Sequence, residues 1–232
     1  MSTTLLLPGL ACDAMMWRDQ LDALAPFGPL RVSDVHSRFD SLPQMAAALL
    51  AEHTGPLRLC GASMGGMLAL EVMRQAPGRV SALALLGSSA RPDTAELLQL
   101  RREAIVLFEQ GRMLEVLLAN VAFAFDPLNA QQPALVRSYL DMIVRAGANQ
   151  LIAQNHAVMA RPDSRPLLPT LNCPVLVACG ASDLLTPPEC SREMAELIPG
   201  ARFELIDECG HMLTLEQPAR VNALLIDWFS QL

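Results

Sequence analysis

Short apolar runs alternate with longer segments of helical periodicity along most of the chain. Thr3–Leu7 is β-branched and apolar and stops at Pro8-Gly9, which predicts a buried strand that ends in a turn. Further strands are predicted at residues 30–33, 57–60, 80–86, 175–179 and 202–206. Helices are predicted at residues 16–24, 45–52, 64–75, 191–197 and 219–229. The alternation predicts an α/β fold: a doubly wound, mostly parallel sheet of about six strands with helices on both faces.

Residues 92–168 interrupt this alternation. They contain helical patterns at 95–110, 113–120 and 134–147 and no convincing strand, and the stretch is too long for a loop. We therefore expect a helical cap inserted into a single core that is formed by residues 1–91 and 169–232. Residues 161–169, with three prolines, are typical of a linker that returns the chain to the sheet.

Composition narrows the classes of function. A hydrophobic fraction of 52% with 18% charged residues describes a chain that buries a large core. The formal net charge of −7 argues against nucleic-acid and anionic-membrane partners, because both need a basic face. The chain has no lysine, which excludes a P-loop and enzymes that form a Schiff base with a lysine amine. The histidine spacings match no zinc motif, so we expect neither a metal nor another cofactor.

The cysteines and the start of the chain bear on the compartment. The six cysteines include no C-x-x-C pair, which favours reduced, mostly buried thiols. The first residues lack the basic region of a secretory signal, and no apolar run approaches the roughly 18 residues of a membrane-spanning helix. We expect a cytoplasmic protein.

The segment Gly61-Ala62-Ser63-Met64-Gly65 matches the pattern G-x-S-x-G between a predicted strand and a predicted helix. This context is what a nucleophile elbow requires, because a tight turn with small flanking residues lifts the serine hydroxyl above the sheet, at a helix N-terminus. Ser63 is therefore the predicted nucleophile. A tight strand–helix turn with an ordinary serine is the alternative.

A serine hydroxyl is a weak nucleophile and needs a base that is oriented by an acid. His211 follows the last predicted strand, at the sheet edge where parallel sheets place their chemistry, and is the predicted base. A partly buried structural imidazole is its alternative. Asp183 follows the preceding strand and is the predicted acid, although it also fits a turn-closing aspartate. Asp207 and Glu208 are its rivals, since they lie nearer His211 in sequence.

Pro8-Gly9-Leu10 follows the first predicted strand. Glycine at this position lets the backbone approach a substrate oxygen, and the N–H groups of Leu10 and Met64 would then form an oxyanion hole. A plain strand-ending turn explains the same residues equally well.

With Ser63, Asp183 and His211 in the order nucleophile, acid, base, the sequence resembles the α/β-hydrolase superfamily over nearly its whole length. Two departures stand out. Pro8-Gly9 stands where many members carry His-Gly, and fuller members begin with an antiparallel hairpin. We therefore expect a shortened sheet of six parallel strands. The resemblance implies acyl transfer to water.

The expected function is a serine hydrolase that cleaves a small or medium carboxylic ester through an acyl-enzyme, with a small-molecule substrate as its partner. A carbon–carbon bond hydrolase or lyase with the same triad is one alternative, and a non-enzymatic ligand-binding member of the fold is another. The insertion and the loops offer apolar side chains for a pocket: Phe108, Phe123, Phe125, Leu10, Met64, Leu184 and Met212. Arginines in the insertion leave a carboxylate-bearing substrate open: Arg101, Arg102, Arg112, Arg137 and Arg145.

Overall fold

The computed structural model describes residues 2–232, and its centre is one six-stranded parallel sheet with the strand order β2-β1-β3-β4-β5-β6. The strands are β1 (Thr3–Leu7), β2 (Leu30–Val32), β3 (Leu57–Ala62), β4 (Val80–Leu86), β5 (Val175–Gly180) and β6 (Arg202–Ile206). The predicted parallel sheet of six strands is confirmed. The strand order reverses between β1 and β3, and ligands of such sheets bind beyond the carboxyl ends of the strands at such a reversal.

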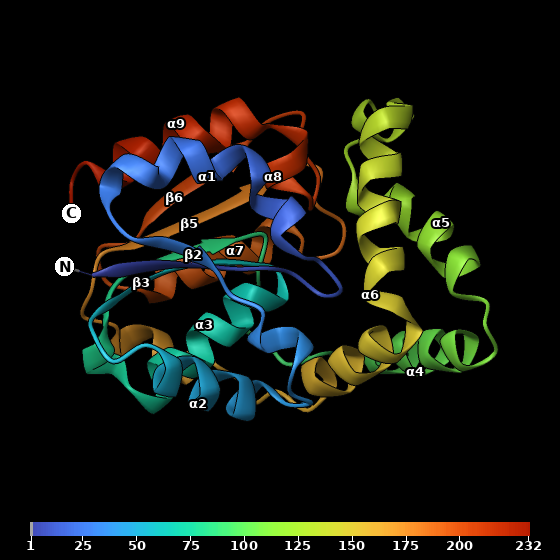
Figure 1. Cartoon of the computed structure of the whole chain (residues 1–232), viewed down its shortest axis with the longest axis horizontal. Coiled ribbons are helices and arrows are strands. Elements are labelled where there is room, and N and C mark those ends of the chain that lie inside the picture. Colours follow the sequence, from blue (N-terminus) through green and yellow to red (C-terminus); the bar gives the residue numbers. More distant parts are fainter. Residues whose placement is uncertain (1) are drawn as a thin grey trace.

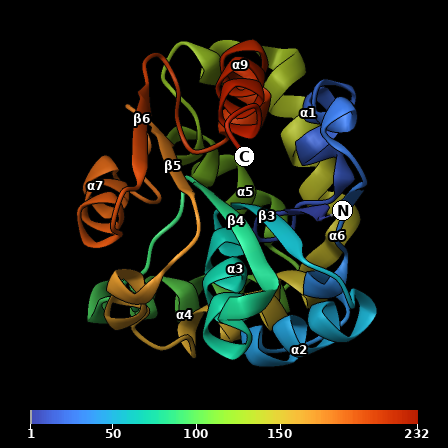
Figure 2. The ribbon, with the colours of Figure 1, turned by 90° about the vertical axis from the view of Figure 1, so that its left-hand side faces the viewer.

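Helices cover both faces of the sheet (Figure 2). One face carries α1 (Arg18–Leu24) and α9 (Pro218–Phe229), and the other carries α2 (Leu42–Glu52), α3 (Met64–Gln75) and α7 (Pro188–Leu197). The strands divide their side chains between the two layers. In β4, Ala84 and Leu86 belong to the apolar cluster of α1 and α9, while Leu83 and Leu85 belong to that of α2 and α3. This period of two is what places a core on each side of the sheet.

Between β4 and β5 the chain forms three helices, α4 (Ala95–Glu109), α5 (Met113–Ala124) and α6 (Pro133–Met159), which we call the cap. The cap lies beyond the carboxyl ends of the strands, on the side of the molecule opposite the two chain ends (Figure 1). The predicted helix at 134–147 was too short. The chain does leave helical geometry at Gly147, where φ is 80°, but it resumes the helix on the far side and continues to Met159.

Other helix boundaries also differ from the predicted ones. Residues Ala14–Trp17 form a 3₁₀ turn, so the first α-helix starts at Arg18 rather than at Met16. Helix α2 starts three residues earlier than predicted, because Ser41 caps it by accepting a hydrogen bond from the Gln44 N–H. Short 3₁₀ turns also occur at Ala25–Phe27, Val35–Ser37, Pro77–Arg79, Asn129–Gln131 and Arg165–Thr170, and a short helix α8 spans Leu213–Glu216.

The two connections between the cap and the sheet are tied together by charge. The Asp93 carboxylate is buried and pairs with Arg161 at 2.7 Å and with Arg101 at 2.6 Å. Arg161 also donates to the Arg91 carbonyl at 3.1 Å. The cap therefore starts and ends at one shared, ion-paired junction.

Across residues 2–232, every helix falls short of the length and hydropathy that crossing a bilayer requires.

Candidate active site

Ser63 stands at the turn from β3 to α3 with φ 53° and ψ −118°, a conformation that residues with a Cβ rarely adopt. The turn is closed by glycines on both sides. A Cβ on Gly61 would overlap the Gly65 carbonyl, and a Cβ on Gly65 would overlap the Leu7 carbonyl of β1. The elbow is therefore packed directly against the end of the neighbouring strand, and only glycine fits at these positions.

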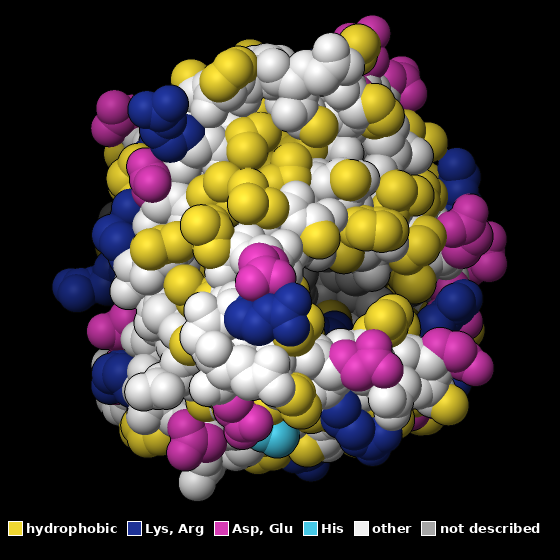
Figure 3. Space-filling model, turned by 90° about the vertical axis from the view of Figure 1, so that its right-hand side faces the viewer, with side chains coloured by type: hydrophobic (Ala, Val, Ile, Leu, Met, Phe, Trp, Pro, Cys, Tyr) yellow, Lys and Arg dark blue, Asp and Glu magenta, His cyan; other side chains and the backbone are white. Residues whose placement is uncertain are grey.

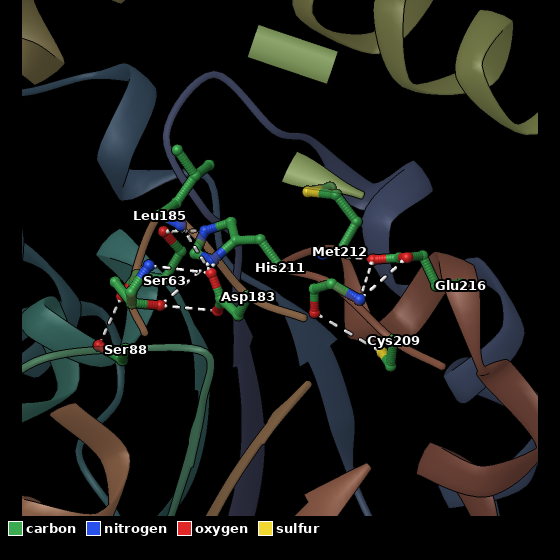
Figure 4. A network of polar contacts seen from close by, with 10 residues as sticks. Ser63, Ser88, Asp183, Leu185, Cys209, His211, Met212 and Glu216 are labelled. Carbon is green, nitrogen blue, oxygen red and sulfur yellow. Dashed lines mark hydrogen bonds and ion pairs between the residues drawn. The ribbon is translucent and has the colours of Figure 1, made fainter. Parts of the chain in front are cut away.

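Three side chains from three loops meet at this turn (Figure 4). His211 Nε2 lies 2.9 Å from Ser63 Oγ, and His211 Nδ1 lies 2.9 Å from Asp183 Oδ2. A carboxylate only accepts, so Nδ1–H donates to Asp183 and Nε2 is left to accept the Ser63 hydroxyl proton. The structure thus brings together the predicted nucleophile, base and acid. The rivals Asp207 and Glu208 lie exposed at the surface.

Asp183 is held in its charged form by its neighbours. Its side chain is fully buried and accepts hydrogen bonds from the Leu185 N–H at 2.9 Å, the Thr186 N–H at 2.9 Å and the Thr186 hydroxyl at 2.8 Å. Burial by itself disfavours the carboxylate, but His211 and Thr186 outweigh burial and hold the pKa of Asp183 below its ordinary value. The same loop therefore orients the acid and keeps it ionised.

The pKa of His211 is shifted in the opposite direction. Burial favours the neutral imidazole, but the charge of Asp183 and its hydrogen bond, with a further contribution from Glu216, raise the pKa above the ordinary histidine value. The imidazolium that forms when the ring takes a proton is thereby stabilised.

Sequence reasoning missed the carboxylate that holds the His211 loop. Glu216 accepts from the N–H groups of Gly210 and Met212, both at 3.0 Å, which flank the histidine on either side (Figure 4). The His211 N–H itself donates to the Ala124 carbonyl at the end of α5, at 2.9 Å. The partners of Glu216 here are backbone N–H groups, so no residue type in the sequence signals this role.

The predicted oxyanion donors come from two segments next to Ser63: the start of α3 and the loop that follows β1. Met64 is the first residue of α3, where N–H groups have no partner inside the helix. Within residues 2–232, neither its N–H nor that of Leu10 donates to another group of the chain. Gly9 is packed against Ser63, since a Cβ built on it would lie 3.3 Å from the Ser63 Cβ.

The apolar surroundings of the site only partly match the predicted set. Phe108, Phe125 and Met212 are buried in one apolar cluster, and Leu10 packs against that cluster from a partly buried position. The Met64 side chain lies in the cluster on the other face of the sheet instead. Phe123 and Leu184 are exposed. Hydrophobic side chains nevertheless surround much of a hollow in the face that the cap forms (Figure 3).

Most of the cap arginines are already paired with carboxylates. Arg101 pairs with Asp93, Arg112 with Glu115, and Arg145 with Asp13. Of the remaining histidines, His53 follows α2 and His156 is exposed on α6. His36 is buried beside the loop that follows β1, where Nε2 lies 2.7 Å from the Cys12 carbonyl.

The fold and the site define a class of protein. The family model for the alpha/beta hydrolase fold matches residues 26–218, and the chain belongs to this family. The chain is 27% identical to a pimeloyl-[acyl-carrier protein] methyl ester esterase of Aromatoleum aromaticum, over 96% of both chains. It superposes on a thermophilic esterase from Thermogutta terrifontis with a TM-score of 0.89 and 27% identity, covering 100% of this chain and 90% of that one. An enol-lactonase from Burkholderia xenovorans shares the fold, with a TM-score of 0.86 and 23% identity over 99% of this chain and 92% of the other. The relatives support a hydrolase role.

Proposed function

We propose that the protein is a serine esterase that hydrolyses a small or medium carboxylic ester through an acyl-enzyme. One observation carries the proposal: an unbroken hydrogen-bonded chain from Ser63 through His211 to Asp183, built on a strained elbow. Both links are 2.9 Å long, and the acid is ionised and buried. This arrangement matches the geometry of an activated serine nucleophile.

In the proposed reaction, Ser63 Oγ attacks the ester carbonyl while His211 Nε2 takes the hydroxyl proton. The N–H groups of Leu10 and Met64 stabilise the oxyanion of the tetrahedral intermediate. The C–O bond to the alcohol breaks, and the imidazolium gives its proton to the leaving alkoxide. Water, deprotonated by His211, then attacks the acyl-enzyme, and the carboxylate product leaves as Ser63 regains its proton.

An uncharged acyl group fits the surroundings of the site. Phe125 and Met212 are buried in one apolar cluster that also contains residues of α6. The cap reaches this region directly, because the His211 N–H donates to the Ala124 carbonyl. Relatives named as esterases, one of them acting on a methyl ester, support the same reaction type.

Replacing the nucleophile tests the proposal. Ser63→Ala should lower kcat for p-nitrophenyl butyrate by about 10⁴–10⁶, because the change removes the attacking oxygen and little packing. Its Tm should stay within a few degrees of wild type. Wild type and variant are purified in parallel, so that a contaminating esterase shows itself in both preparations. A residual rate within about tenfold of wild type would contradict the assignment.

Multiple turnover separates an esterase from a ligand-binding member of the fold. Wild-type protein should release many equivalents of nitrophenolate per site, and a fluorophosphonate probe should label Ser63 and stop the release. Labelling of wild type with no more than one equivalent released would instead indicate a reactive serine without esterase function.

A further inference from the structure

A buried polar network joins the cap to the loop that follows β1. The Ala11 N–H donates to the Gln154 side-chain oxygen at 2.6 Å, and the Gln154 side-chain nitrogen donates to the His36 carbonyl at 2.8 Å. His36 Nε2 in turn lies 2.7 Å from the Cys12 carbonyl. Gln154, on α6, is 1% exposed, and His36 is 4% exposed. The loop is therefore held from two sides by side chains that lie far from it in sequence.

The protonation of this network follows from its partners. A carbonyl only accepts, so His36 Nε2 carries the proton that goes to Cys12, and Nδ1, which is buried without a partner among residues 2–232, carries the lone pair. Burial also lowers the pKa of His36, which keeps the ring neutral. The contact between cap and loop is thus formed by hydrogen bonds between neutral groups.

The loop that the network holds is strained. The Cys12 N–H donates to the Gly9 carbonyl at 3.1 Å, which makes Leu10 and Ala11 the central residues of a turn. Ala11 has φ 54°, a value for which this position of a turn normally uses glycine. A residue with a Cβ keeps such a conformation only when its surroundings hold it. Here the bond from the Ala11 N–H to Gln154 fixes the plane of the Leu10–Ala11 peptide.

We propose that Gln154 is a positioning residue for the esterase reaction: by holding the Leu10–Ala11 peptide, it keeps the adjacent Leu10 N–H aimed at the oxyanion. Without this bond the Leu10–Ala11 peptide is free to rotate towards a negative φ at Ala11. The change in ψ at Leu10 that accompanies this rotation shifts the neighbouring Gly9–Leu10 peptide, which carries the Leu10 N–H. The inference rests on the proposed function. It also means that the oxyanion hole is complete only when α6 is docked, so the cap contributes to catalysis without touching the reacting atoms.

Gln154→Met tests this role, because it keeps the size of the side chain and removes both polar atoms. We expect kcat for p-nitrophenyl butyrate to fall by about 10–100-fold with KM within about threefold, since displaced oxyanion donors act on the transition state. A trifluoromethyl ketone, whose adduct with Ser63 carries an oxyanion, should lose affinity by a similar factor. Asn155→Leu is the matched control: it removes a buried amide from the next position of the same helix and should leave kcat within about threefold.

Gln154→Glu separates positioning from packing. It keeps an oxygen that accepts from Ala11 while placing a carboxyl group in a buried site, so it should retain more kcat than Gln154→Met even where its Tm is lower. If Gln154→Met does not fold, Gln154→Glu carries the test. Its kcat should then lie within about tenfold of the wild-type value. A larger loss of kcat in Gln154→Glu would overturn the proposal.

Two further results would overturn the positioning role. One is a Gln154→Met enzyme with kcat within twofold of wild type, and the other is a change confined to KM with unchanged affinity for the ketone. The proposed esterase function is tested separately, by the ester turnover of the wild-type protein. A wild type without ester turnover would overturn both proposals, whereas normal turnover by wild type and Gln154→Met alike would overturn this one alone.

Discussion

The candidate acid, Asp183, differs from its rivals Asp207 and Glu208 by its place in the fold. It follows β5 and contacts His211 across 28 positions, whereas Asp207 lies only four positions away and is exposed. Asp183→Asn should lower kcat by about 10²–10⁴, because an amide favours the wrong tautomer of the imidazole. Asp207→Asn is the matched control and should stay within about threefold of wild type on the same nitrophenyl ester. A damaging Asp207→Asn beside a mild Asp183→Asn would reverse the assignment.

The pH dependence of the reaction should report the environment of His211. The base must be neutral, and its pKa is raised, so kcat/KM should increase with pH through a midpoint above about 6.5. Asp183→Asn removes the charge that raises this pKa, so the midpoint should move down in that variant. Initial rates between pH 5 and 9 measure both, and a profile that is flat from about pH 5 to 8 would contradict the role of His211.

The same shift affects stability. A raised pKa means that the folded state binds the proton more tightly than the unfolded chain does. The His211 interaction therefore stabilises the fold fully below about pH 6.5, and its contribution is lost as pH rises through the folded pKa.

At the scale of the elements, the ion-paired junction between the cap and the sheet is held together by the Asp93 carboxylate. Asp93→Asn keeps the shape and removes the charge opposite Arg161, whose side chain is only 7% exposed. Leaving a buried cation unpaired should lower the free energy of unfolding by about 3–5 kcal/mol, measured by urea denaturation. Asp163→Asn, which removes an exposed pair with Arg165, is the control and should cost less than about 1 kcal/mol. Equal losses in the two variants would contradict the buried junction.

The Asp93 pair also has a defined pH range. Burial raises the pKa of this carboxyl group, but the two arginines outweigh burial and hold the pKa below its ordinary value. The stabilisation is therefore present above about pH 3.9 and is lost as pH falls through the lowered pKa.

Strands and helices could be predicted where an apolar pattern ends or begins at a turn that contains glycine. The strand at Thr3–Leu7 and the helix at Met64–Gln75 occur with the predicted bounds, because each ends or begins at a turn that the sequence marks. The second part of α6 was missed, because its inward face carries the amides of Gln154 and Asn155, which break the helical pattern of apolar residues. The proposed role of Gln154 had no signal in the sequence, since its partner is a backbone N–H 143 positions away.

At the scale of the whole molecule, the strand order explains why the candidate site residues come together. The carboxyl ends of parallel strands lie at one edge of the sheet. Residues that directly follow β3, β5 and β6 therefore lie near one another, whatever conformation the loops adopt. The sequence does not, however, show which loop the cap contacts. Those contacts include the Ala124 carbonyl and the Gln154 amide, which are groups that hydropathy does not distinguish.

The apolar surroundings of the site predict a dependence on acyl length. From nitrophenyl acetate to butyrate, kcat/KM should rise by up to roughly fourfold per methylene, because each buried methylene contributes about 0.8 kcal/mol. Nitrophenyl half-esters of dicarboxylic acids should be poorer substrates than uncharged esters of equal length. A strong preference for the charged series would contradict an apolar pocket.

In that case two arginine variants would identify the group that binds the substrate carboxylate. Arg102 and Arg137 are the candidates, since these two cap arginines have no carboxylate partner in the described part of the chain. Loss of the preference for charged esters in Arg102→Gln or Arg137→Gln would show which of them binds the carboxylate.

The position of β1 has a practical consequence for handling the protein. The chain enters β1 on the side of the molecule that lies farthest from the cap (Figure 1). Because the sequence contains no lysine, amine-coupling reagents meet no side-chain amine anywhere on the surface. A lysine introduced at an exposed position on that side would be the one side-chain amine in the sequence, and a solid support that couples through it would hold each molecule in one orientation. The cap would face the solution, and a dissolved ester would reach every immobilised molecule from the same side.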